Sequence, residues 1–181
     1  MRRDAKLRRD ALIAAAAESF AERGYGVPLE EIAARAGVGR GTLYRNFRDR
    51  ETLALAIFEG EVDRVEKAVA HEQDLRQSLI DLVLAGTRGT ALFARIAADI
   101  VADTENMAAF EALGERLARV LDPVATRARA NGDVRADIDG EKLGLALRMV
   151  SGLFHDLHEG PAGQRKLEDA LDLVFDGLRP R

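Results

Sequence analysis

The side chains with the most specific chemistry lie close together between residues 40 and 50. This stretch, RGTLYRNFRDR, interleaves guanidinium groups with hydroxyl groups. Arginine presents a planar fork that fits a phosphate or the O6 and N7 atoms of guanine, and threonine and tyrosine hydroxyls donate to phosphate oxygens. We therefore expect the outward-facing residues of this stretch, which include no carboxylate, to contact nucleic acid. These residues are Arg40, Gly41, Thr42, Tyr44, Arg45 and Arg48, and Arg50 is expected on the same side.

Two short helices must hold these side chains in place. The helix expected over residues 28–36, with Pro28 at its first position, carries apolar residues at the i, i+3, i+4 and i+7 spacing of one face. The turn 37–39 follows, where Gly37 supplies a positive φ, and a second helix covers residues 40–47. This arrangement is a helix-turn-helix. Its remaining apolar residues are expected to point back toward the neighbouring helices, and they are Val38, Leu43 and Phe47.

From shape and charge alone, two interpretations of this unit stay open. One is DNA binding, and the other is an ordinary pair of packed helices whose outer face is basic by accident. The residues favour the first, because the stretch GYGVPLEEIAARAGVGRGTLYRNFRDRETL resembles the N-terminal domain of the TetR family of bacterial transcriptional repressors. The resemblance covers roughly residues 10–58, and its most specific part is the pattern AGV-x-x-GTLY-x-x-F.

The resemblance implies that the second short helix is a recognition helix in the major groove. One departure concerns the start of the preceding helix, where many members carry a phosphate-contacting Thr or Ser and this chain has Val27-Pro28. The implied roles are base reading by Arg40 and Arg45, phosphate contact by Thr42, Tyr44 and Arg50, and close approach to DNA by Gly39 and Gly41.

Five basic side chains stand near the N-terminus, and two interpretations of them stay open. They can form an arm that reaches into the minor groove, or they can be the solvated start of the first helix, expected over residues 4–23. Two acidic residues, Asp4 and Asp10, dilute their charge. The basic residues are Arg2, Arg3, Lys6, Arg8 and Arg9.

The rest of the chain is predicted to be helical, because no stretch shows the clean alternation of a strand. The fold class is therefore all-α, with a DNA-binding domain over residues 1–50 and a regulatory and dimerisation domain over residues 51–181. Gly24 and Asn131-Gly132 are expected to end helices, and Pro123 is a candidate break. About nine helices are expected, over residues 4–23, 28–36, 40–47, 49–70, 72–87, 90–102, 105–130, 139–159 and 163–178.

Composition excludes several classes of protein. The 181 residues are 47% hydrophobic and 32% charged, which is typical of a globular chain. The absence of cysteine excludes disulfide scaffolds and thiolate metal sites. No apolar run is long enough to span a membrane, and the charged start does not resemble a secretory signal, so a cytoplasmic protein is expected. Residues 1–58 carry 11 Lys and Arg against 8 Asp and Glu, whereas the remainder carries 16 against 23, a basic head on an acidic body.

No pattern indicates an enzyme, a cofactor or a metal site. The chain has no Gly-x-Ser-x-Gly turn and no phosphate-cradling loop before a lysine. His155 and His158 stand at a spacing that can share a metal, but no third ligand follows at a fixed spacing. The alternative for this pair is an interaction with the negative end of the helix dipole or hydrogen bonds across a dimer interface.

A homodimer is expected, because one helix-turn-helix buries too little surface for tight specific binding and paired heads about 34 Å apart reach successive major grooves. The helix over residues 139–159 has two apolar stripes, so it needs two packing partners. The resemblance implies a four-helix bundle made by the last two helices of each subunit. Burial within its own chain is the alternative. The expected interface residues are Leu145, Met149, Leu153, Leu171 and Val174.

The resemblance also implies a small-molecule pocket among the middle helices, whose occupation moves the two heads apart. Such a pocket would be mostly apolar with a few polar anchors. The candidate lining residues, each of which can instead be plain core, are Phe93, Ile96, Met107, Phe110 and Met149.

The sequence thus predicts a homodimeric repressor that binds a palindromic operator of double-stranded DNA and releases it on binding a small-molecule effector. The alternative is a helical protein-interaction module with a vestigial DNA-binding head.

Overall fold

The computed structural model describes residues 2–69, 104–153 and 161–180. These residues form seven helices and no strand, so the all-helical prediction is confirmed for this part of the chain, while the count of about nine is not. The helices expected over 72–87 and 90–102 lie outside the described residues. The observed helices are α1 (Arg2–Arg23), α2 (Leu29–Arg35), α3 (Arg40–Asn46), α4 (Arg50–Val69), α6 (Thr104–Asn131), α7 (Gly140–Leu153) and α8 (Pro161–Leu178).

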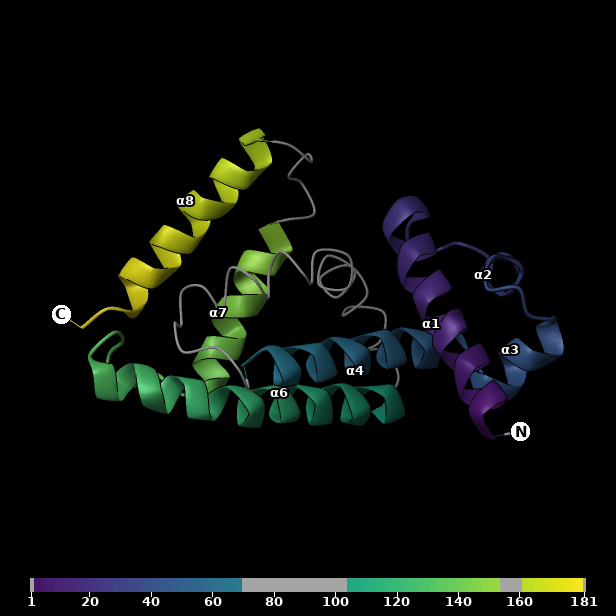
Figure 1. The fold of residues 1–181 in the computed structure, drawn as a ribbon, viewed down its shortest axis with the longest axis horizontal. Helices are drawn as coiled ribbons and strands as arrows, with labels where there is room; N and C mark the ends of the chain where they lie inside the picture. The colour runs from purple at the N-terminus through teal and green to yellow at the C-terminus, as the bar shows by residue number, and fades with distance from the viewer. Residues whose placement is uncertain (1, 70–103, 154–160, 181) are drawn as a thin grey trace.

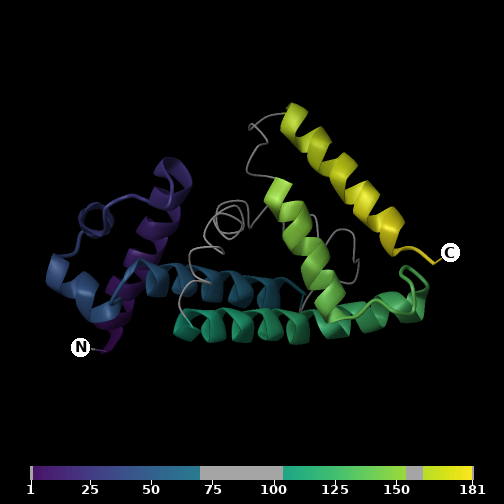
Figure 2. The ribbon, with the colours of Figure 1, turned by 180° about the vertical axis from the view of Figure 1, so that it is seen from behind.

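The described helices build a molecule with a small helical head at one end (Figure 1). In the head, α1 packs against α2, α3 and α4. α4 then runs beside α6, while α7 packs on α6 and α8 packs on α7. Seen from behind, the head and α8 again lie at opposite ends (Figure 2).

A first hydrophobic cluster fills the head. It draws on α1, α2, α3 and the first turns of α4, and its buried side chains include Leu12, Phe20, Ile32 and Leu53. Because each of these side chains comes from a periodic apolar stripe, burying them fixes the orientation of each helix about its own axis.

A second hydrophobic cluster joins the end of α4 to α6, α7 and α8. Its fully buried residues include Leu121 and Leu143. Val69 of α4 belongs to this second cluster, whereas Phe58 of the same helix belongs to the first. α4 is therefore one continuous helix that packs into both cores.

α6 runs without a break through Pro123, so the break considered there is not observed. A proline inside a helix removes a backbone hydrogen bond and costs about 3 kcal/mol. Its neighbours Leu121, Val124 and Ala125 are all buried in the second cluster. Burial of a leucine or valine side chain contributes about 1.5–3 kcal/mol, so packing offsets the local cost of the proline.

Except for the C-terminal end of the helix expected over 139–159, which lies outside the described residues, the other predicted boundaries agree with the described helices to within about two residues. This is the usual uncertainty of a helix end. Pro28 is the N-cap of α2, with φ −58° and ψ 134°, and not its first helical residue. α1 and α6 end before Gly24 and Gly132, as predicted.

α6 and α7 approach each other so closely that only glycine fits at position 140. A Cβ atom there would lie 2.0 Å from the carbonyl oxygen of Ala118 and 2.7 Å from the backbone nitrogen of Asp122. The Asp122 carboxylate accepts a hydrogen bond from the Gly140 N–H at 2.9 Å. This bond satisfies one of the free donors at the start of α7 and ties that end to α6.

Replacing Gly140 by alanine is therefore expected to lower the free energy of unfolding by about 1–3 kcal/mol, because backbone atoms of α6 must shift to admit the methyl group. The matched control is Gly60→Ala in α4, where the glycine is exposed and has open space around it. That change should raise the free energy of unfolding by about 0.5–1 kcal/mol. Urea unfolding at one protein concentration measures both, and the same sign of effect for both variants would contradict the close packing.

Candidate nucleic-acid interface

The turn between α2 and α3 sets the direction of α3. Gly37 follows the end of α2 and has a φ of +67°, in the left-handed region that favours glycine. The Gly37 N–H donates to the Ala34 carbonyl at 3.1 Å, and the Val38 N–H donates to the Ala33 carbonyl at 3.0 Å. These two bonds form a Schellman motif. The positive φ predicted for Gly37 is therefore confirmed. It is the backbone conformation that the Schellman motif requires at the C-terminal end of α2.

α3 is anchored through one face. Leu43 and Phe47 are buried in the core of the head, and Val38 packs against that core from the turn. All three point inward as predicted. Because fully burying a leucine or phenylalanine contributes about 1.5–3 kcal/mol, these two anchors hold α3 in one rotational setting about its axis.

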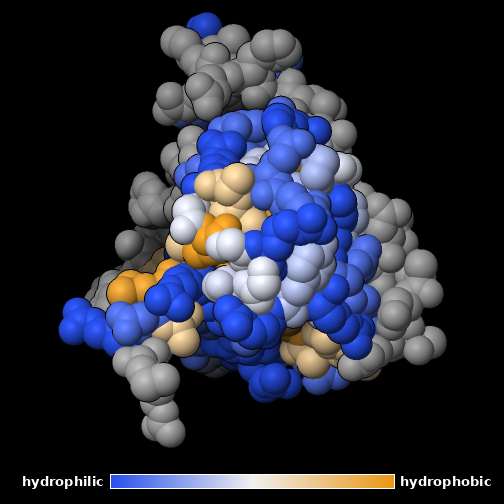
Figure 3. Space-filling view, turned by 90° about the vertical axis from the view of Figure 1, so that its right-hand side faces the viewer, coloured by the Kyte–Doolittle hydropathy of each residue, from blue (hydrophilic) through white to orange (hydrophobic). Residues whose placement is uncertain are grey.

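The opposite face of α3 carries the predicted contact residues. The end of the molecule that holds the head presents a largely hydrophilic surface over the described residues (Figure 3). All seven predicted residues lie in the head, on α3, in the turn that follows it or at the start of α4. Arg40, Gly41, Tyr44, Arg45 and Arg48 are exposed there, whereas Thr42 and Arg50 are partly buried.

A carboxylate that the sequence analysis did not include lies against this face. Glu30, in the first turn of α2, accepts hydrogen bonds from Arg40 Nη2 at 2.9 Å and from the Tyr44 hydroxyl at 3.0 Å, both on its Oε1 atom. Its own backbone amide, followed by Tyr44 and Arg40, lowers the pKa of Glu30 below its ordinary value, so the group is ionised at neutral pH. No linear pattern pairs these residues, because the contact depends on the angle between α2 and α3.

The Tyr44 hydroxyl has one proton, and in this structure it donates that proton to Glu30. A contact from this hydroxyl to a phosphate therefore requires the hydroxyl to leave Glu30. Further along α3, Arg45 Nη2 donates to Thr42 Oγ1 at 3.3 Å, and Asn46 Nδ2 donates to the Thr42 carbonyl at 2.7 Å. These local bonds order the second half of the helix.

Arg50, at the start of α4, is held by the turn between α1 and α2. Its guanidinium donates to the Tyr25 carbonyl and lies 5.3 Å from the centroid of the Tyr25 ring. A cation over an aromatic face is attracted by the negative charge of the ring face. Arg50 therefore helps to hold the head together, in addition to the phosphate contact predicted for it.

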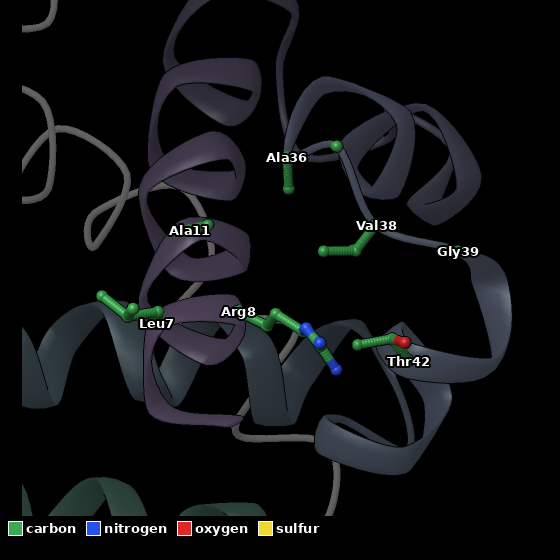
Figure 4. A pocket seen from close by; sticks show the side chains of 8 residues that line it. Leu7, Arg8, Ala11, Ala36, Val38, Gly39 and Thr42 are labelled. Carbon is green, nitrogen blue, oxygen red and sulfur yellow. The ribbon is translucent and has the colours of Figure 1, made fainter. Parts of the chain in front are cut away.

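A groove of about 330 Å³ separates α1 from the turn before α3. Arg8 of α1 points across this groove toward Thr42 of α3 (Figure 4). The guanidinium of the next residue, Arg9, lies 4.8 Å from the centroid of the Phe47 ring. α1 is already helical at Arg2, so the basic run is the start of a helix and not a detached arm. Arg8 adds a cation beside the face of α3.

α4 begins with a capping interaction beside these basic residues. Asp49 Oδ1 accepts a hydrogen bond from the Thr52 N–H at 2.7 Å, and Arg48 Nε donates to Asp49 Oδ2 at 2.7 Å. Partial burial of Asp49 opposes its ionisation, but the hydrogen bonds from Thr52 and Arg48 prevail and lower the pKa of Asp49. The carboxylate is the N-cap of α4.

Replacing Asp49 by alanine is expected to lower the free energy of unfolding by about 1 kcal/mol at neutral pH, through loss of the N-cap. Because the pKa of Asp49 is lower in the folded than in the unfolded chain, its contribution is present above about pH 4 and is lost as the pH falls through the folded value. Urea unfolding between pH 7 and pH 3 should show the difference from the natural chain narrowing in acid. Asp49→Asn keeps a capping oxygen and is the control; a difference that does not vary with pH would contradict this role.

The predicted dimer residues divide between surface and core. Leu145 and Met149 of α7 are 50% and 59% exposed. Leu171 of α8 is only 1% exposed, so it is a core residue of one chain and not a surface open to a partner, which corrects the prediction for it. Leu173 of the same helix is 76% exposed. Val174 is partly buried against the second cluster, and the Leu153 side chain lies outside the described residues.

The described part of the chain holds three of the five predicted pocket residues. Phe93 and Ile96 lie outside it, and Met107 is partly buried. Phe110 lies edge-on to Phe58 of α4, with ring centroids 6.3 Å apart, and packs against the core of the head. Met149, predicted for both the pocket and the interface, is exposed in the single chain.

Two kinds of feature are absent from the described residues. No helix there is long and apolar enough to cross a membrane. No group of three or more potential metal ligands comes together in the same part of the chain. The pair His155 and His158 lies outside it.

A glycine-closed turn, two buried anchors under a short helix and a basic outer face define a helix-turn-helix protein of the DNA-binding class. The family model for bacterial regulatory proteins of the tetR family matches residues 12–57. The crystal structure of the TetR transcriptional regulator SCO0520 from Streptomyces coelicolor has a TM-score of 0.67 and 31% identity, over 95% of this chain and 98% of that one. The chain therefore belongs to the TetR family of transcriptional regulators.

Two curated relatives differ in how much of their length is matched. The transcriptional repressor AcnR of Corynebacterium diphtheriae is 28% identical over 178 residues, which are 96% of this chain and 92% of AcnR. The transcriptional activator FasR of Mycolicibacterium smegmatis is 40% identical over 77 residues, which are 40% of this chain and 35% of FasR. The chain thus spans about a third of FasR and nearly all of AcnR.

Proposed function

We propose that this chain is a repressor that binds a palindromic operator as a homodimer and releases it when a small molecule binds. The observation that carries the proposal is the basic outer face of α3, turned outward by the buried Leu43 and Phe47. Similarity over nearly the whole length of AcnR, against a third of the activator FasR, favours repression. Residues 1–50 form the DNA-binding part and residues 51–181 the regulatory part, and action on chromosomal DNA places the protein in the cytoplasm.

In this proposal α3 enters the major groove, as the recognition helices of helix-turn-helix proteins do. Its N-terminal end then lies nearest the base edges, where Arg40 presents its fork to a guanine and Arg45 reads a second base. Thr42 and Tyr44 contact phosphates, and the cations that open α4 neutralise the adjoining backbone. Gly41 has no side chain, so the backbone of α3 between these residues can come close to the DNA.

The dimer is made through α7 and α8, and exposed apolar side chains on both helices support it. Leu145, Met149 and Leu173 are each at least half exposed in the single chain. Large apolar side chains exposed together mark an interaction surface more often than a solvated one. A two-fold axis through this interface holds the two α3 helices at a fixed separation. At a separation near 34 Å, both helices can enter successive major grooves on the same face of the duplex.

The effector acts by changing that separation. α4 packs into both cores, and Phe110 of α6 contacts Phe58 of α4 beside the head. A ligand among the body helices that shifts α6 therefore moves α4 and the head with it. The ligand must bind the DNA-incompetent arrangement more tightly than the competent one, because equal affinity for both shifts nothing.

Replacing Arg40 by alanine is expected to relax sequence preference at one base pair of each half-site, because a bidentate arginine–guanine contact contributes about 1–3 kcal/mol of discrimination. Arg48→Ala removes the same charge from the same surface and should weaken binding to all duplexes alike. A change at Arg50 would also break its contacts with Tyr25, so Arg50 is not used as the control. Selection of bound duplexes from a random pool gives the preference at each position. Unchanged preference in the Arg40 variant would remove the base-reading role.

Replacing Met149 by glutamate is expected to convert the dimer to a monomer at micromolar concentration, because a charge buried in an apolar interface costs several kcal/mol. Ala14→Glu places the same charge on the exposed side of α1 and should leave the dimer intact. Sedimentation velocity measures both. A Met149 variant that remains as dimeric as the control would rule out this interface.

A further inference from the structure

Glu30 is a carboxylate beside the exposed face of α3, and the proposed DNA contacts give it no role. A carboxylate close to approaching phosphates weakens binding through like-charge repulsion. Its two partners, Arg40 and Tyr44, stand one helical turn apart on the same face of α3, and both reach the same oxygen. Glu30 thus ties the first turn of α2 to the exposed side of the recognition helix.

The geometry of the Arg40 contact leaves its recognition fork usable. The ion pair joins Nη2 to Glu30 Oε1 at 2.9 Å, which occupies one of the five N–H groups of the guanidinium. The Arg40 side chain is still 73% exposed. A bidentate contact to guanine needs two parallel N–H groups, and the guanidinium can supply them while it keeps one bond to Glu30.

We propose that Glu30 is a positioning residue for base reading: it holds the Arg40 guanidinium in the orientation that meets a guanine. Its presence raises discrimination at the base pair that Arg40 reads and lowers affinity for DNA of unrelated sequence. This inference rests on the proposed function, in which α3 is the recognition helix.

The physical reason is the freedom of an arginine side chain. An unrestrained exposed arginine loses rotamer entropy when it binds one base, and it also reaches neighbouring phosphates, which gives affinity without sequence preference. A restrained guanidinium loses less entropy on binding the base and reaches fewer phosphates. Supporting residues that orient a contacting residue are a general requirement of precise sites.

The chain provides a matched control one residue away. Glu31 lies in the same turn of α2 and is exposed, and its ion pair is with Arg23 of α1. Glu31→Gln removes the same charge from the same turn without touching Arg40. Comparing Glu30→Gln with Glu31→Gln therefore separates orientation of Arg40 from the simple loss of a negative charge.

The test measures binding of each full-length variant to three duplexes by fluorescence anisotropy: the selected operator, an operator changed at the base pair that Arg40→Ala relaxes, and an unrelated duplex. Glu30→Gln should lose about fivefold or more of the preference between the first two and bind the unrelated duplex more tightly. Glu31→Gln should keep the preference. The double variant with Arg40→Ala should show the preference of Arg40→Ala alone, because coupled residues are not additive.

Three results for Glu30→Gln would overturn the inference. The first is an unchanged sequence preference, and the second is an equal loss of affinity for all three duplexes. The third is a sharper preference, which would mean that Glu30 competes with DNA for Arg40. Glu30→Ala serves as a second variant and should lose the same preference. If Arg40→Ala relaxes no base pair at all, the proposed base reading fails and this inference fails with it. That outcome is recognised before any Glu30 variant is compared.

Discussion

Burial of Leu43 and Phe47 beneath α3 is the interaction on which the rest of the head depends. A helix of seven residues is too short to be stable alone, so its form and its orientation come from packing. The same burial that stabilises α3 turns Arg40, Tyr44 and Arg45 outward. The Schellman turn at Gly37 brings α3 onto the core at the angle that makes this burial possible. Stability and the presentation of the basic face therefore have one cause.

α4 extends this constraint from the head to the body. Its first residues are fixed by the Asp49 cap and by Arg50 on Tyr25, and its last turn lies in the second core with Val69. The edge-on contact between Phe58 and Phe110 adds an aromatic contact between α4 and α6 at this boundary. A helix shared by two cores cannot tilt in one without repacking the other. The proposed regulation of the DNA-binding head depends on this property.

Features set by local chain geometry could be predicted from the sequence. The inward side of α3, the positive φ of Gly37 and the ends of α1 and α6 follow from spacing and from the unusual freedom of glycine. Features set by contacts between helices could not. The pairing of Glu30 with Arg40 depends on a crossing angle, and the passage of α6 through Pro123 depends on burial of its neighbours. α8 carries apolar residues on more than one side, so its sequence pattern did not indicate that Leu171 is buried and Leu173 is exposed.

In the proposed complex, two copies of α3 bind one duplex and must release counterions, and the salt dependence of binding measures this release directly. Each neutralised phosphate contributes about −0.9 to the slope of log affinity against log salt concentration, so two heads that each neutralise two or three phosphates give a slope of about −4 to −5. Anisotropy titrations on an operator duplex between about 50 and 200 mM salt should show that slope. A slope near zero, or no binding at the lowest salt, would contradict a DNA-binding dimer and favour a helical protein-interaction module.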